Sequence, residues 1–316
     1  MRTDAPAGLP QLAGRPFLSD GGLETWLVFQ EGLDLPCFAA FALLKDEAGI
    51  ATLRRYFRPY LALAREAGTG FVFESPTWRA SRDWGERLGY GPTALAAANR
   101  RAMGLGVELR RAQPELPMVL SGCVGPRGDG YSPATLMTAG EARAYHAEQI
   151  EALAAGGAEM ISAITMTHAG EAGGVALAAR DIGLPVAISF TVKTDGTLPS
   201  GQPLGDAVAE VDEATEAAPV YFMINCAHPT HFAHLFATRA DWTRRIRGLR
   251  ANASRCSHAE LDAATELDDG DPMDLGARYA QLLRTLPQLA VLGGCCGTDH
   301  RHVAAIARAC LHPPLS

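Results

Sequence analysis

Short apolar runs rich in β-branched and aromatic residues alternate with longer segments of helical periodicity along the whole chain. Several of the short runs are apolar at nearly every position, which is typical of strands buried on both faces of a parallel sheet. The predicted strands span residues 17–19, 70–74, 118–122, 160–163, 186–190, 220–225, 246–251 and 289–293. Amphipathic or alanine-rich segments predict helices over residues 50–67, 93–112, 141–155, 171–181, 206–217, 230–236, 273–285 and 300–310.

Eight units of strand followed by helix predict an α/β fold of the (β/α)8 (TIM) barrel class. A chain of 316 residues has an ordinary length for one such barrel. A doubly wound open sheet is the alternative, but no Gly-x-Gly-x-x-Gly follows the first predicted strand. No internal repeat or low-complexity linker divides the sequence. We therefore predict a single domain over residues 1–316, with the barrel formed by about residues 17–310.

Composition narrows the partners to small molecules. A net charge of -7 and a pI near 5.7 argue against nucleic acid and anionic membranes. No apolar run approaches the roughly 18 residues of a membrane span, and the N-terminus lacks the apolar region of an export signal. Seven cysteines, an odd number, then suggest reduced thiols. We expect a cytoplasmic protein, and the sequence leaves its oligomeric state open.

The most informative motif is the adjacent cysteine pair in the segment Gly293-Gly294-Cys295-Cys296-Gly297-Thr298. A disulfide between neighbouring residues is strained, because their Cα atoms are only about 3.8 Å apart. Two such thiolates can instead share a soft metal ion, most often Zn²⁺. Cys226 follows the sixth predicted strand, and barrel strands end at one common mouth. Cys226, Cys295 and Cys296 therefore predict a catalytic zinc site with an open fourth position.

Other interpretations of this region have less support from the sequence. Gly293-Gly294 could cradle a phosphate, but two cysteines are unusual in a phosphate loop. His228, His231 and His234 could supply a zinc ligand or a base, although their spacing of three is more typical of partly exposed helix positions. Lys193 is one of only two lysines and would be the Schiff-base residue of a lyase, yet it lies in a polar turn.

Acidic residues at strand ends are candidates for substrate binding. Asp20 ends the first predicted strand, so its carboxylate would face the same mouth as the cysteines and could hold a substrate ammonium group. Capping of a helix or turn explains an aspartate there equally well. Glu74 ends the second strand and is a weaker candidate by the same geometry.

Several motifs resemble the homocysteine S-methyltransferase family, which includes betaine- and S-methylmethionine-dependent enzymes and the homocysteine-binding module of cobalamin-dependent methionine synthase. These motifs are Asp20-Gly21-Gly22, Ser121-Gly122-Cys123-Val124-Gly125-Pro126, Ser189-Phe190, Asn225-Cys226 and residues 293–298. The resemblance implies a zinc barrel with Cys226, Cys295 and Cys296 as ligands. It also implies a substrate site that includes Asp20, the Gly21-Gly22 backbone and Asn225.

The chain departs from that family at the fourth strand. The family sequence there ends in Glu-Thr-Ile-Pro, whose glutamate binds the substrate amino group, whereas this chain reads Ala163-Ile164-Thr165-Met166. Alanine would thus stand in place of the acid, and Glu74 is our candidate to replace its charge from another strand. Residues 252–254 match the family only in part.

The resemblance implies transfer of a methyl group from a sulfonium or ammonium donor to a thiol, with homocysteine as the favoured acceptor and methionine as the product. A free thiol with a pKa near 8.5 is a poor nucleophile at neutral pH, and coordination to Zn²⁺ would deprotonate it. The donor is not specified by the sequence. The alternatives are a different thiol acceptor, a Schiff-base lyase using Lys193, and a non-catalytic zinc-thiolate redox sensor.

Overall fold

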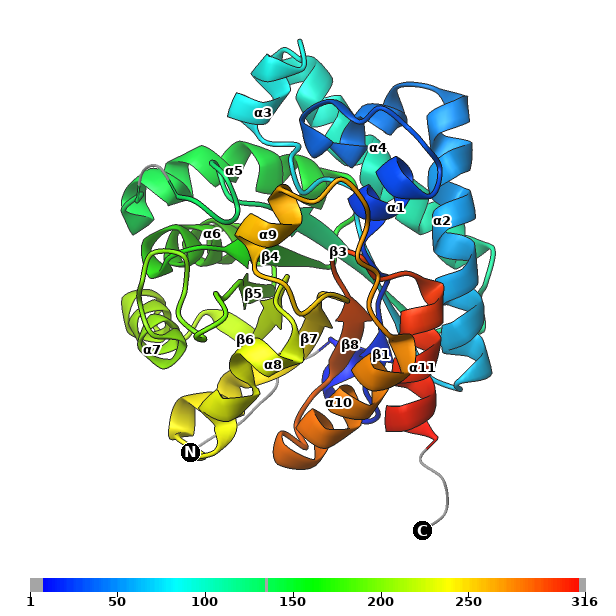
Figure 1. Ribbon diagram of the computed structural model, residues 1–316. Helices are drawn as coiled ribbons and strands as arrows, with labels where there is room; N and C mark the ends of the chain where they lie inside the picture. Colours follow the sequence, from blue (N-terminus) through cyan, green and yellow to red (C-terminus); the bar gives the residue numbers. More distant parts are fainter. Residues whose placement is uncertain (1–7, 134–135, 313–316) are drawn as a thin grey trace.

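The computed structural model shows a closed barrel of eight parallel strands surrounded by helices (Figure 1). The structure describes residues 8–133 and 136–312. The strands follow one another around the barrel in chain order: β1 (Phe17–Leu18), β2 (Phe71–Glu74), β3 (Met118–Val124), β4 (Met160–Met166), β5 (Val186–Phe190), β6 (Pro219–Asn225), β7 (Ile246–Ala251) and β8 (Val291–Gly294). All eight predicted strands are present, and β1 pairs with β8 to close the barrel. The prediction of a single-domain (β/α)8 barrel is confirmed.

The predicted helices are also present, with boundaries shifted by a few residues. They are α2 (Glu47–Glu66), α4 (Pro92–Arg111), α5 (Ala139–Ala155), α6 (Ala169–Asp181), α7 (Leu204–Thr215), α8 (Pro229–Phe232, continued by a 3-10 helix, Ala233–Phe236), α10 (Pro272–Thr285) and α11 (His300–Leu311). Three short helices were not predicted: α1 (Leu23–Phe29), α3 (Arg82–Arg87) and α9 (His258–Asp262). Further 3-10 helices span Pro10–Leu12, Pro36–Phe38, Ala40–Lys45 and Asp241–Arg245. Within the described residues, no helix is long and apolar enough to cross a membrane.

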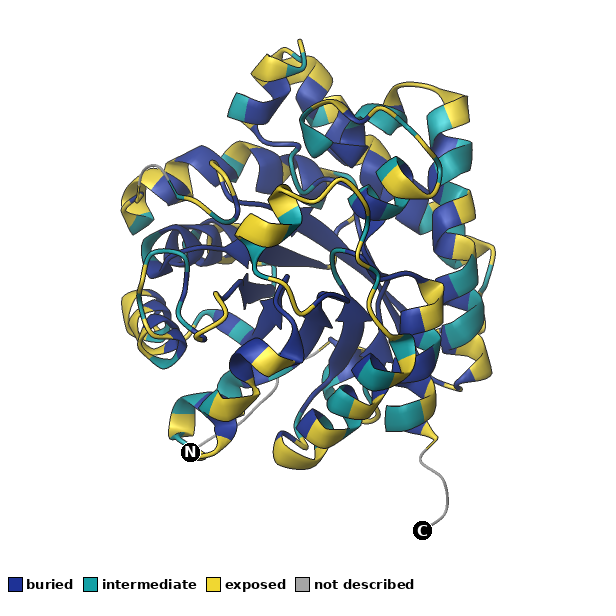
Figure 2. Cartoon of the chain, in the orientation of Figure 1, coloured by how far each residue is buried: buried dark blue, intermediate teal, exposed yellow. Residues whose placement is uncertain are grey.

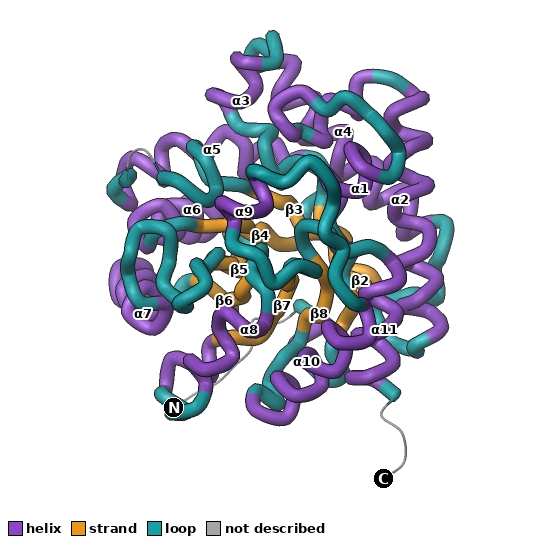
Figure 3. The backbone as a smooth tube through the Cα atoms, viewed as in Figure 1, coloured by secondary structure: helices purple, strands orange, loops and turns teal. Residues whose placement is uncertain are grey.

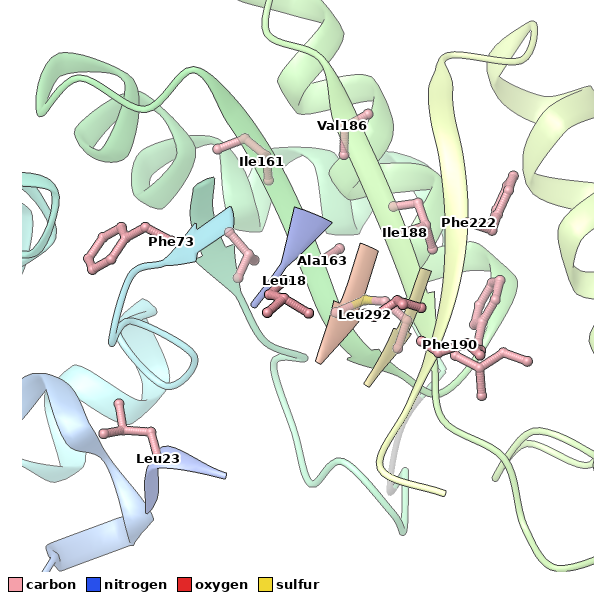
Figure 4. Close-up of a cluster of buried hydrophobic side chains, with 14 of the residues drawn as sticks. Leu18, Leu23, Phe73, Ile161, Ala163, Val186, Ile188, Phe190, Phe222 and Leu292 are labelled. Atoms are coloured by element: carbon pink, nitrogen blue, oxygen red, sulfur yellow. The ribbon is translucent and has the colours of Figure 1, made fainter. Parts of the chain in front are cut away.

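The strands are buried on both faces and separate two apolar layers (Figure 2). The outer layer packs the sheet against the helices, and Figure 4 shows part of it, including Ile161, Ala163 and Ile188. The inner layer contains Phe17, Val72, Val119, Met160, Tyr221 and Val291 inside the barrel, with Leu9 from the segment before β1 packed on them. This alternation follows from the period of two along a strand. Because apolar side chains fill both layers along the strands, the polar and reactive side chains lie at the carboxyl ends of the strands.

The loops that follow the strands gather at one mouth of the barrel (Figure 3). The connection that joins β7 to α10 contains α9 and crosses in front of the strands in this view. In such barrels the loops after the strands carry the functional residues. The three short helices that were not predicted, α1, α3 and α9, all belong to these loops.

Candidate active site

A cavity of about 450 Å³ opens at the carboxyl ends of the strands. Its volume is in the range of ordinary small-molecule sites. Side chains from distant parts of the chain line it, among them Asp20, Glu24, Glu74, Arg79, Arg250, Cys226, Cys295 and Cys296. The strand ends therefore bring the predicted cysteines and acids to one place, as the barrel topology requires.

The three predicted metal ligands converge in this cavity. The Sγ atoms of Cys226, Cys295 and Cys296 all lie within 4.8 Å of one another, and those of Cys226 and Cys296 are 3.8 Å apart. Tetrahedral zinc with Zn–S bonds of about 2.3 Å separates its sulfur ligands by about 3.8 Å. Across residues 8–133 and 136–312, no other group of three His, Cys, Asp or Glu side chains has a spacing that suits a metal ion.

Two of these cysteines are oxidised in the structure. Cys226 and Cys295 form a disulfide, whereas Cys296 carries a free thiol. The expectation of reduced thiols therefore does not hold for this pair. Burial raises the pKa of the Cys296 thiol to about 11. Because metals bind the thiolate form, all three sulfurs become ligands only after reduction and loss of their protons.

The end of β7 holds the backbone of both cysteine segments. The amide of Cys226 donates to the carbonyl of Arg250 at 3.1 Å, and the amide of Cys295 donates to the carbonyl of Ala251 at 2.8 Å. Cys226 has a φ of 52°, in the left-handed region that non-glycine residues seldom occupy. Such strain persists only where the surrounding structure over-determines the conformation. The backbone thus fixes the direction in which this sulfur points.

Gly21 and Gly22 bring the start of α1 against the cysteine loop. The amide of Gly22 donates to the carbonyl of Thr298 at 3.0 Å. A Cβ atom on Gly22 would lie 2.5 Å from the carbonyl oxygen of Cys295. Glycine is therefore required by close backbone approach, and both glycines line the cavity as predicted.

Asn225 lies behind the cysteines and does not line the cavity. Its Oδ1 accepts hydrogen bonds from the Thr165 amide at 2.9 Å and the Ser189 hydroxyl at 2.6 Å. Its Nδ2 donates to the Thr165 hydroxyl at 2.8 Å and lies 3.9 Å from Sγ of Cys295. Thr165 also has a positive φ, 66°. Asn225 therefore joins β4, β5 and the cysteine loop, and its predicted part in substrate binding stays a prediction.

Asp20 lines the cavity, but both of its oxygens already have partners. Oδ1 accepts from Nη1 of Arg250 at 2.7 Å, and Oδ2 accepts from the Tyr56 hydroxyl at 3.0 Å. Asp20 does not cap a helix, since α1 begins after Gly22 without a side-chain cap. Arg250 was not predicted as a site residue. Its signal was an arginine inside a predicted strand that is otherwise buried, because arginine is seldom buried without a partner.

Glu74 also lines the cavity. Its Oε2 is buried and has no hydrogen-bond partner among the described residues. Burial raises the pKa of Glu74 to about 7, although the positive charge of Arg250 acts in the opposite direction. Glu24, on α1, was not predicted, and burial raises its pKa to about 7 as well. The cavity therefore contains carboxyl groups that change charge near neutral pH.

The β4 residue that stands in place of the family's glutamate is not the one predicted. Ala163 packs in the outer layer between the barrel and the helices (Figure 4). The β4 side chain that lines the cavity is Ile164. The cavity-facing side of β4 therefore lacks an acid, and the residue at that position is Ile164, not Ala163.

The weaker candidates lie outside the reactive cluster. His228 accepts a hydrogen bond from the amide of Thr230, and His231 contacts the carbonyl of Arg255. Lys193 is exposed and does not line the cavity. The amide of Gly294 donates to the carbonyl of Asp20 at 2.8 Å, so it is not available to cradle a phosphate.

Two loops approach each other over the cysteines. The rings of Tyr131, in the loop after β3, and His258, in α9, stack with centroids 3.9 Å apart. The Tyr131 hydroxyl lies 3.8 Å from Sγ of Cys296. Trp78 also lines the cavity, and the guanidinium of Arg79 lies 4.7 Å from its ring centroid.

The fold is a (β/α)8 barrel with a cavity at the strand ends where three cysteines converge. The family model described as homocysteine S-methyltransferase matches residues 17–310, and the chain belongs to that family. It is accordingly a methyl-transferring enzyme.

Individual relatives agree with this assignment. The chain is 26% identical to homocysteine S-methyltransferase 4 of Zea mays over 330 aligned positions, covering 96% of this chain and 91% of the relative. The oxidised form of the homocysteine methyltransferase MmuM from Escherichia coli superposes with a TM-score of 0.73 at 20% identity, covering 92% of this chain and 94% of MmuM. The metallated form of MmuM gives a TM-score of 0.70 at 19% identity, with coverages of 93% and 96%. The MmuM comparisons support the fold.

Proposed function

We propose that the protein is a zinc-dependent S-methyltransferase that moves a methyl group from a sulfonium or ammonium donor to a thiol, with homocysteine as acceptor and methionine as product. The observation that carries the proposal is the convergence of Cys226, Cys295 and Cys296 within 4.8 Å at the wall of a charged cavity. Membership in the homocysteine S-methyltransferase family supports the choice of acceptor.

The donor set fits zinc after reduction of the disulfide. Three soft sulfur ligands with an open fourth position are typical of catalytic zinc, and a metallated form of MmuM is known. Zn²⁺ bound by the three cysteines would lower the pKa of an acceptor thiol and keep its sulfur nucleophilic at neutral pH.

The chain's own residues would hold the two substrates in line. The loops carrying Tyr131 and His258 cover the cysteines and would exclude water, while Trp78 offers an aromatic face to a cationic donor. Alignment of acceptor and donor raises their effective concentration, which is the main contribution a protein makes to a direct displacement.

The other candidate functions are less well supported. A Schiff-base lyase is disfavoured because Lys193 is exposed and remote from the cavity lining. The disulfide between Cys226 and Cys295 is the observation that favours a redox sensor. A sensor, however, has no use for a charged cavity of substrate size beside its thiols. Cytoplasmic location and the absence of nucleic-acid partners remain predictions.

A mass-spectrometric screen tests the proposal. Reduced, zinc-loaded protein is incubated with homocysteine and, in turn, S-methylmethionine, S-adenosylmethionine and betaine. We expect methionine from at least one donor, and none from the Cys296→Ala variant. Cys310→Ala is the matched control, because Cys310 lies in α11 away from the cavity lining. Failure of every donor with every thiol tried would refute the proposed function.

A further inference from the structure

Arg250 is buried at the wall of the cavity with its guanidinium only partly used by the protein. Nη1 donates to the Ser19 hydroxyl and to Oδ1 of Asp20, each at 2.7 Å, and Nη2 donates to the carbonyl of Gly21 at 3.3 Å. A guanidinium has five N–H groups. Nε–H and one Nη2–H therefore have no acceptor among the described residues.

The unused groups suit one kind of ligand. Nε and Nη2 share one edge of the planar guanidinium, and such an edge binds a carboxylate through two parallel hydrogen bonds. The opposite side of the group is already fixed by Ser19 and Asp20, so little side-chain freedom would be lost on binding.

The local sequence makes this placement possible. Arg250 on β7 lies opposite Gly293 on β8. A Cβ atom on Gly293 would lie 2.1 Å from Oγ of Ser19, which is the oxygen that receives Nη1. Glycine at position 293 thus leaves room for the contact that joins Arg250 to β1.

An unpaired group of opposite charge lines the same cavity. Glu74 lines the cavity with its Oε2 unpartnered, while the Ser121 and Ser162 hydroxyls lie beside the same carboxyl group. Both oxygens of Asp20, in contrast, already accept hydrogen bonds from Arg250 and Tyr56. A ligand that carries both a carboxylate and an ammonium group would satisfy Arg250 and Glu74 together.

We propose that Arg250 is a specificity residue that binds the α-carboxylate of an amino-acid thiol acceptor, while Glu74 receives its α-ammonium group. Asp20 then acts as a positioning residue for Arg250. This inference rests on the proposed function in that it treats the cavity as the acceptor site. It also accounts for amino-acid recognition in a chain with isoleucine at the cavity-facing position of β4.

Equilibrium binding, measured by calorimetry on reduced, zinc-loaded protein without a methyl donor, tests the inference. The ligands are homocysteine, 4-mercaptobutyrate, which lacks the ammonium group, and 3-mercaptopropylamine, which lacks the carboxylate. Arg250→Met should raise the Kd for homocysteine and for 4-mercaptobutyrate by about tenfold to a hundredfold. It should change the Kd for 3-mercaptopropylamine by less than about threefold. Arg250→Lys keeps a positive charge beside Asp20 and should give a smaller loss with the same selectivity.

Arg247→Met is the matched control, since Arg247 lies on the same strand but contacts the carbonyl of Gln288 and does not line the cavity. Equal losses for all three thiols in both Arg250 variants would assign Arg250 a structural role only and overturn the inference. Failure of the unaltered protein to bind homocysteine would overturn it as well. Selective binding without methyl transfer from any donor would leave the inference standing and refute the proposed function.

Discussion

At the scale of single residues, the acceptor site depends on which carboxylates are still available. The Asp20 carboxylate forms an ion pair with Arg250 and accepts a hydrogen bond from the Tyr56 hydroxyl, so it cannot also hold a substrate ammonium at full strength. Glu74 retains an unpartnered oxygen. The sequence alone could identify both acids at strand ends but could not identify their partners, because Arg250 and Asp20 are 230 positions apart.

The two neighbouring positions on β4 give a matched pair of substitutions. Ala163→Glu would bury a carboxylate among apolar side chains in the outer layer, and we expect it to lower the free energy of unfolding by more than about 3 kcal/mol. Ile164→Glu places the acid at the cavity and should fold. It should lower KM for homocysteine without lowering KM for 4-mercaptobutyrate.

Denaturant unfolding and steady-state kinetics check this pair. Similar stability of the two variants would contradict the assignment of Ala163 to the outer layer. An equal change in KM for both thiols would show that the acid at position 164 does not reach the amino group.

The pH dependence of acceptor use should identify Glu74. Its pKa is raised to about 7, so the carboxyl group is mostly neutral below that pH and charged above it. Only the charged form can pair with an ammonium group. We therefore expect kcat/KM for homocysteine to fall as the pH decreases through about 7.

Glu74→Gln should remove this dependence. Glu24→Gln is the control, since the pKa of Glu24 is also about 7 and the two acids must be distinguished. If the pH dependence persists in Glu74→Gln and disappears in Glu24→Gln, the titrating acid is Glu24 and the assignment to Glu74 is contradicted.

At the scale of elements, the site depends on close contact between the start of α1 and the loop after β8. A Cβ on Gly22 would lie 2.5 Å from the carbonyl oxygen of Cys295. We expect Gly22→Ala to destabilise the protein by about 1–3 kcal/mol through overpacking and to weaken zinc binding, because Cys295 must move.

Gly104→Ala is the matched control for that substitution. Gly104 is exposed within α4 and has nothing within 4 Å of an added Cβ, so alanine should stabilise the helix by up to about 1 kcal/mol. Thermal unfolding and zinc titration measure both effects. Unchanged zinc affinity in Gly22→Ala would show that the cysteine loop does not need this contact.

The strands and long helices could be predicted from the sequence because their apolar periodicity extends over whole elements. The short helices could not. α1 spans seven residues and α9 five, which is too short to show an apolar period. The one sequence signal for α9 is the capping box of Ser257 and Glu260 at its start. Ala163 was placed at the substrate by matching residues 163–166 to the family's Glu-Thr-Ile-Pro. In the structure β4 continues to Met166 with a register shift between Ala163 and Met166, and Ile164 is the side chain that lines the cavity.

At the scale of the whole molecule, the barrel topology explains why Cys226 meets the adjacent pair Cys295 and Cys296, although Cys226 and Cys295 are 69 positions apart. β6 and β8 both flank β7, and the end of β7 bonds to the backbone of Cys226 and of Cys295. The convergence could therefore be predicted once the eight-strand order was recognised. The disulfide between Cys226 and Cys295 could not, because spacing shows that sulfurs can meet and says nothing of their oxidation state.

Zinc content measured by elemental mass spectrometry after reduction and zinc loading tests the central claim most directly. We expect one zinc per chain in the unaltered protein, and little zinc in Cys226→Ala, Cys295→Ala and Cys296→Ala. Cys256→Ala and Cys310→Ala should keep full zinc, since neither residue belongs to the three-sulfur cluster. Full zinc retention in all three cluster variants, or no zinc in the unaltered protein, would contradict the account.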